Sequence, residues 1–147
     1  MNPQHCLETA VLAGEILTKS GAETYRVEET MRYILSVSGF DTAEAFALPT
    51  GVFASIATQG TQAITLVKRI DQRGINLSSI AQVNDISRAL KANQITMEEA
   101  YDQLKQIKAK AYSRMIHHFS TIFLIFGFVL LLNGSLSDAV FSMINGL

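Results

Sequence analysis

The chain has 147 residues, with 12 basic and 13 acidic side chains and a formal net charge of −1 at pH 7. This length suits one core of ordinary size, and the balanced charge gives no basic footprint for nucleic acid, which is excluded as an expected partner. The single cysteine, Cys6, cannot close an internal disulfide or build a thiolate zinc site, and we expect it to be a small buried residue.

The first 40 residues predict two helices. Apolar residues recur at helical spacing over residues 4–19, and Gly21 is the expected stop of this first helix. Ser20 and Glu23 stand in the S-x-x-E relation of a capping box, which predicts the start of a second helix. Gly39 marks the expected end of that second helix.

The next segment changes to short runs rich in Ala, Val, Ile, Thr and Phe. Turn chemistry at "LPTG" and "TQGTQ" interrupts these runs, because proline presets φ and glycine tolerates positive φ. The pattern predicts three strands, at about 41–48, 52–58 and 62–70, in an antiparallel meander. One face of this sheet is expected to be covered by helices and the other to be at least partly wet.

Two further helices follow the strands. A helical pattern runs over about residues 78–90, and Thr96 and Glu99 form a second capping box before a fourth helix whose inner face reaches Ala111. The sequence therefore predicts an α+β fold in the order helix-helix, three-stranded antiparallel meander, helix-helix, followed by a transmembrane helix.

The last quarter of the chain has a different composition, because every charged residue except Asp138 lies at or before Arg114. The apolar run predicts one membrane span at about 116–133 and the start of a second at about 136–147. The expected organisation is a cytoplasmic domain over 1–112 and a membrane segment over 113–147. Basic residues before the span place that domain in the cytosol, with the chain in the cell (inner) membrane and in contact with lipid.

Three segments together resemble the N-terminal half of the threonine/serine exporter family: "SGAETYRVEETMRYILSVSG", "ALPTGVFASI" and "RIDQRGINLSSIAQVNDISRAL". The resemblance implies a cytoplasmic domain joined to membrane helices, in an exporter of small polar amino acids. In split relatives it implies a subunit of a dicarboxylate (succinate) exporter. We expect the further transmembrane segments that transport requires to come from a partner chain or a longer parent protein.

A polar cluster is the candidate contact for a carboxylate-bearing solute or a partner. Its members are expected to gather where the third strand leads into the third helix: Glu23, Arg26, Arg69, Asp71, Arg73 and Asn76. Arginine suits this role because a guanidinium binds a carboxylate through two hydrogen bonds. The structural alternative is that Glu23 caps its helix while Arg26 and Glu28 are solvated helix charges. The spacing of Glu28 and Arg32 predicts an outward-facing pair at i, i+4.

The sequence contains few side chains that could form a catalytic site. The histidines are His5 and the adjacent pair His117 and His118, so no nucleophile and base stand out, and we expect no catalytic residue, metal or cofactor. The alternative from another class is a hydrolase-like or regulatory cytoplasmic domain anchored to the membrane, in which Ser55 or Glu23 would be the residue to test.

Overall fold

The structure, a computed structural model, describes residues 2–58, 60, 62–107 and 114–145. The chain divides into two compact units, unit 1 over Met1–Ala109 and unit 2 over Lys110–Leu147. Unit 1 contains seven consecutive elements of the expected types, two helices, three strands and two helices, which makes it an α+β fold. Its elements are α1 (Pro3–Lys19), α2 (Thr24–Ser36), β1 (Thr42–Leu48), β2 (Gly51–Ala57), β3 (Ile64–Arg69), α3 (Leu77–Lys91) and α4 (Met97–Gln106).

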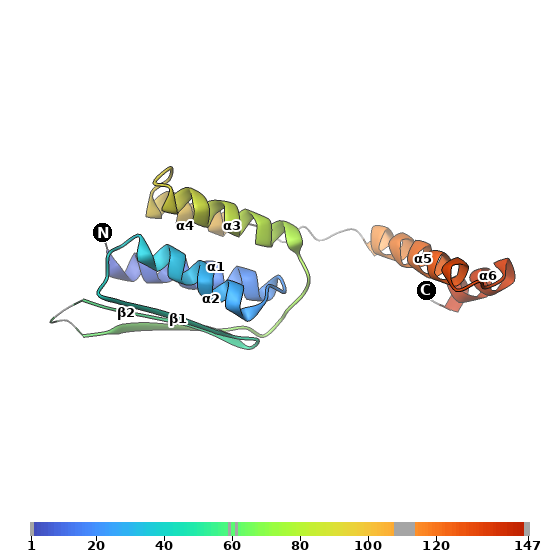
Figure 1. Ribbon diagram of the computed structural model, residues 1–147, viewed down its shortest axis with the longest axis horizontal. Helices are drawn as coiled ribbons and strands as arrows, with labels where there is room; N and C mark the ends of the chain where they lie inside the picture. Colours follow the sequence, from blue (N-terminus) through green and yellow to red (C-terminus); the bar gives the residue numbers. More distant parts are fainter. Residues whose placement is uncertain (1, 59, 61, 108–113, 146–147) are drawn as a thin grey trace. The chain divides into compact units, whose positions relative to one another are not determined.

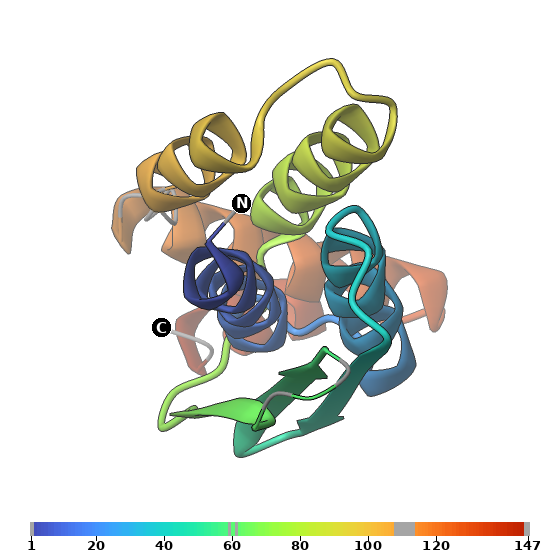
Figure 2. The ribbon, with the colours of Figure 1, turned by 90° about the vertical axis from the view of Figure 1, so that its left-hand side faces the viewer.

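Unit 1 has three layers. The sheet forms one layer, α1 and α2 lie on one of its faces, and α3 and α4 cover the other side of α1 and α2 (Figures 1 and 2). Helix α1 is central, because it packs against α2, β2, β3, α3 and α4. Its side chains are accordingly buried on more than one side, including Leu7, Ala10 and Leu17, and Cys6 is buried as expected.

The sheet is a three-stranded antiparallel meander in the order β1-β2-β3, as the sequence predicts. Its inner face carries Ala45, Val52, Ala54 and Ile56, which are buried against the helices. On the opposite face Phe53 lies between Phe46 and Val67 in the strand register, and the side chains of Phe46 and Val67 are exposed. The expectation of one covered and one partly wet face is therefore confirmed.

The observed helix ends agree with one of the two predicted capping boxes and contradict the other. Ser20 is the C-cap of α1, and Glu23 is the N-cap of α2 without a side-chain capping bond, so the predicted capping box of Ser20 and Glu23 is wrong. The chain between these two residues turns through Gly21 at positive φ, which leaves no room for a reciprocal cap. The capping box of Thr96 and Glu99 is confirmed.

Helix α4 ends at Gln106, earlier than the sequence pattern predicts. The proposed inner-face position Ala111 lies outside the described residues.

Unit 2 consists of α5 (Arg114–Leu131) and α6 (Leu136–Asn145), which contact each other. A turn with Asn133 at positive φ joins them, and Asp138 accepts hydrogen bonds from the backbone N–H and the hydroxyl of Ser135 at the start of α6. The expected transmembrane helix at about 116–133 is not supported, since no helix in the described part of the chain combines the length and apolar character that crossing a bilayer requires. Helix α5 has 18 residues, whereas a span needs about 20.

Candidate functional site

The loop between β3 and α3 lies against the turn that joins α1 to α2. The backbone N–H of Gly74 donates to the carbonyl of Lys19 at 2.8 Å, and the N–H of Asn76 donates to the carbonyl of Ser20 at 3.0 Å. These bonds satisfy two carbonyls that the end of α1 leaves without helical partners. Two of the three sequence segments quoted above are therefore joined through their backbones.

The remaining segment, "ALPTGVFASI", and the end of α4 lie at the same end of unit 1. The N–H of Ile70 donates to the carbonyl of Thr50, in the turn between β1 and β2, at 2.9 Å. Ile107, after the end of α4, lines a groove together with Ser20 and Ser79. We call this end of unit 1 the junction end and define it as residues 18–25, 48–51, 69–79 and 104–107 (Figure 1).

Gly21 is required by the way the loop docks. Its φ is +82°, a conformation that residues with a side chain rarely adopt, and a Cβ at this position would lie 2.8 Å from the carbonyl oxygen of Gly74. The glycine of the "SGAET" stretch is thus explained by close backbone approach.

Arg73 and Asn76, two of the six candidate residues, have structural partners within the junction end. Arg73 Nε donates to the carbonyl of Thr18 at 3.3 Å, which places a positive charge at the C-terminal end of α1, where the helix dipole favours it. Asn76 Oδ1 accepts a hydrogen bond from the N–H of Ser79 at 3.1 Å and so caps α3.

Three other candidate residues lie at the junction end in exposed positions. Arg69 Nε donates to Asp71 at 2.9 Å, and these side chains are 85% and 74% exposed. Glu23 forms a side-chain hydrogen bond with Tyr25 that raises the pKa of the tyrosine hydroxyl above its usual value. Exposed pairs of this kind contribute little to stability, so these groups are available to a partner.

Arg26, in the first turn of α2 next to the junction end, directs its side chain to a different groove. It lines a groove of about 200 Å3 between α2 and α3, together with Glu29, Tyr33 and Asn84 among others, and its side chain makes no ion pair with any residue that the structure describes. Five of the six predicted residues therefore lie at the junction end, and the side chain of the sixth, Arg26, lines a different groove although its backbone N–H donates to the carbonyl of Glu23 at 3.0 Å.

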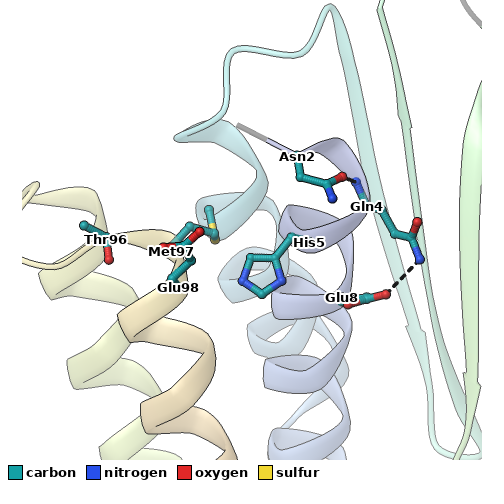
Figure 3. A pocket seen from close by; sticks show the side chains of 7 residues that line it. All are labelled: Asn2, Gln4, His5, Glu8, Thr96, Met97 and Glu98. Carbon is teal, nitrogen blue, oxygen red and sulfur yellow. Dashed lines mark hydrogen bonds between the residues drawn. The ribbon is translucent and has the colours of Figure 1, made fainter.

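Sequence reasoning missed a larger pocket of about 540 Å3 between the starts of α1 and α4 (Figure 3). It is lined by Asn2, Gln4, His5, Glu8, Thr96, Met97 and Glu98. The His5 ring contacts the Tyr101 ring edge-on at 4.9 Å, and its Nε2 is buried without a hydrogen-bond partner in the described structure. The lining contains two carboxylates and no Lys or Arg, so its electrostatics oppose a dicarboxylate.

The sequence indicated only one of the two helix starts that form this pocket together. The capping box of Thr96 and Glu99 indicated where α4 begins, but helical periodicity cannot say which other helix start lies beside it. The contact arises from the packing of α4 on α1.

The residues considered for other chemistries have ordinary surroundings. Ser55 Oγ lies 2.9 Å from Thr65 Oγ1 on the open face of the sheet, as a cross-strand hydroxyl pair. Within the described ranges, no group of three or more His, Cys, Asp or Glu residues is placed to hold a metal ion.

The comparisons with known proteins define the class of the chain as a transport protein. A family model described as "Putative threonine/serine exporter" (ThrE) matches residues 8–147. The chain therefore belongs to the threonine/serine exporter family, which confirms the resemblance seen in the sequence and implies a membrane location. Neither the comparison with curated proteins nor the comparison with solved structures gives a match.

Proposed function

We propose that the chain is a component of a secondary exporter of small amino acids and that it needs further transmembrane segments to transport. The family match over residues 8–147 carries this proposal. Secondary transporters bind their substrate near the bilayer midplane, usually between repeats built from several helices. The partner chain or the longer parent protein would supply those helices, and the solute would be a small amino acid or, in a split system, a dicarboxylate.

Efflux measurements test this proposal. Cells expressing the chain alone, or together with its candidate partner helices, are loaded with labelled threonine, serine or succinate. We expect efflux only with the added helices, and the solute that leaves the cell identifies the substrate class. Efflux from the chain alone would refute the need for further helices, whereas no efflux in any combination would refute the transport proposal.

The proposed location is the inner membrane, with unit 1 in the cytoplasm. The basic flank before α5 supports this orientation, because positive charge is retained on the cytoplasmic side. The test uses Gln72→Cys, an exposed loop position, in a chain whose own cysteine is buried. A membrane-impermeant thiol reagent should label this variant in inverted vesicles and leave it unlabelled in intact cells, and the opposite pattern would reverse the orientation.

Among the six candidate residues, we propose Arg26 as the first contact for the solute carboxylate. Its guanidinium is unpaired within the described structure, and Glu29 in the same groove offers a carboxylate for an ammonium group. A zwitterionic amino acid matches this pair of charges. Arg26→Gln should weaken threonine binding to the full chain, measured by calorimetry, whereas Arg69→Gln at the junction end should leave it unchanged; the reverse ranking would assign the contact to the exposed loop cluster.

The alternative from another class is a membrane-anchored hydrolase-like or regulatory domain. Turnover of an ester or amide that is lost in Ser55→Ala would favour the hydrolase. A change in gene expression or partner activity without any change in solute flux would favour regulation.

A further inference from the structure

The three most exposed large hydrophobic side chains of unit 1, among its described residues, all lie at the junction end. Ile75 is 88% exposed, Leu77 is 73% exposed and Tyr25 is 62% exposed. Ile75 and Leu77 flank Asn76, whose side chain turns inward to cap α3, and the position of a Cβ on Gly21 would lie 3.6 Å from Ile75 Cγ1. The loop is thus fixed in place while its apolar side chains remain in solvent.

Cationic side chains surround these apolar groups. Lys19, Arg69, Arg73 and Lys105 are exposed at the same end, where the exposed carboxylates are those of Glu23 and Asp71. Lys19 also pairs with Glu15 at 2.6 Å. Arg73 is held by its bond to Thr18, and Arg69 is bonded only to Asp71. Apolar and aromatic groups bordered by positive charge are typical of surfaces that bind anionic lipid headgroups.

The path of the chain leads from the same end. Ile107 is the last described residue of unit 1 before α5, and it shares its groove with Ser20 and Ser79. In the sequence, Lys108, Lys110 and Arg114 follow, and no acidic residue occurs between Asp102 and Asp138. The positive charge of the junction end therefore continues along the chain toward its most apolar segment.

We propose that the junction end docks on a bilayer surface that carries anionic headgroups, with Ile75 and Leu77 entering the interfacial region. This inference rests on the proposed membrane location and goes beyond it, because it names the surface of unit 1 that faces lipid. The open face of the sheet is a weaker candidate, since its exposed residues Phe46 and Val67 are accompanied by Glu44 and, among the described residues, by a single cation, Arg69, at the edge that meets the junction end.

The chain contains no tryptophan, which allows a direct test by fluorescence. Single-tryptophan variants Ile75→Trp and Leu77→Trp of the full chain are reconstituted into vesicles that contain phosphatidylglycerol and lipids brominated near the headgroup. We expect a blue-shifted emission and quenching of at least about twofold, because an interfacial side chain lies within reach of the bromines. Phe46→Trp, a 55% exposed position on the open sheet face, is the matched control and should show neither effect.

A second set of measurements tests whether binding requires anionic lipid. Adding Arg69→Gln to Leu77→Trp should reduce the quenching in phosphatidylglycerol vesicles, and pure phosphatidylcholine vesicles should reduce it in both backgrounds. Arg69 is chosen because its side chain is 85% exposed and bonds only to Asp71.

Several outcomes would overturn the proposal. Emission at the water-exposed wavelength in both loop variants would do so, as would equal quenching in Phe46→Trp or failure of the chain to remain with the vesicles. A blue shift that needs a co-reconstituted partner chain and occurs without quenching by brominated lipid would assign the surface to protein. Efflux is measured separately, so quenching without efflux would contradict the proposed transport function and leave the docking surface intact.

Discussion

Glu28 Oε1 accepts a hydrogen bond from the backbone N–H of Ala47 at 3.0 Å, which ties α2 to the edge strand β1. From the next turn of α2, Arg32 donates to the carbonyl of Ala45 at 3.3 Å. The two side chains therefore bind an N–H and a C=O on β1, which is an edge strand of the sheet in the described part of the chain. Occupied backbone groups at an edge discourage pairing with other chains.

Removing this contact should destabilise unit 1 and expose its edge. Glu28 is 21% exposed, and we expect Glu28→Ala to lower the free energy of unfolding by about 1–2 kcal/mol because the Ala47 N–H loses a charged acceptor. Glu28→Gln retains an acceptor and should cost less. Urea unfolding followed by circular dichroism measures both, with Asp85→Ala in an exposed ion pair as the control; equal stability of Glu28→Ala and this control would contradict the role assigned to the bond.

The backbone contact at Gly21 gives a second prediction. Gly21→Ala should cost about 1–3 kcal/mol, because it forces a positive φ on alanine and pushes a Cβ against the Gly74 carbonyl. Gly74→Ala is the matched control, since a Cβ there meets nothing within 4 Å, and its effect should stay within about 0.5 kcal/mol. A neutral Gly21→Ala in the same unfolding assay would show that the loop does not dock as described.

Helix α1 approaches α2 closely at Gly14. A Cβ at this position would collide with the side chain of Met31, which is fully buried and cannot move into solvent. We expect Gly14→Ala to cost about 1–3 kcal/mol through overpacking. The same substitution should cost less in a Met31→Val background, and a double-mutant cycle measures the coupling. Equal costs in the two backgrounds would mean that the collision is relieved elsewhere.

The cap of α4 predicts a dependence on pH. Hydrogen bonds from the Thr96 backbone N–H and then from its hydroxyl lower the pKa of Glu99 below its usual value. A lowered folded pKa means that the carboxylate stabilises the fold above its ordinary pKa and that this contribution is lost as the pH falls through the folded pKa. An NMR titration should show the low midpoint, and Thr96→Ala should move it upward. The melting temperature should also differ more between wild type and Thr96→Ala at neutral pH than in acid, and an unchanged difference would contradict the linkage.

The sequence predicted those parts of the fold that depend on local chemistry. Helical periodicity located α1 and α3 closely, and turn residues separated the three strands. Glu28 and Arg32 show the limit of such reasoning. Their spacing predicted a solvated pair, yet their nearest charged atoms are 4.0 Å apart and both side chains bind the backbone of β1. Which strand lies beside a helix is decided by packing between distant segments, and a spacing rule carries no information about it.

The same limit applies to the candidate site. A strand-to-helix loop rich in Arg, Asp and Asn was correctly predicted near the second helix, and it does meet the turn before α2. Arg26 was placed in that cluster together with Glu23 because both lie in the stretch that resembles the exporter family. Residues three apart within a helix lie on nearly the same face, but Glu23 is the N-cap and precedes the helix. The Arg26 side chain lines a groove with residues of α3, and packing between distant segments decides which neighbour that helix face meets.

The central position of α1 has a consequence for the order of events during synthesis. Helix α1 precedes every element that covers it, and the burial of Leu7 and Leu104 in one core joins residues almost a hundred positions apart. At about 5–20 residues per second, the ribosome takes on the order of 5–20 s to travel between them. Throughout that interval the apolar residues of α1 have no completed layer to cover them. Uncovered apolar surface of this kind is what makes nascent chains prone to aggregation, and unit 1 can close its core only after translation has passed α4.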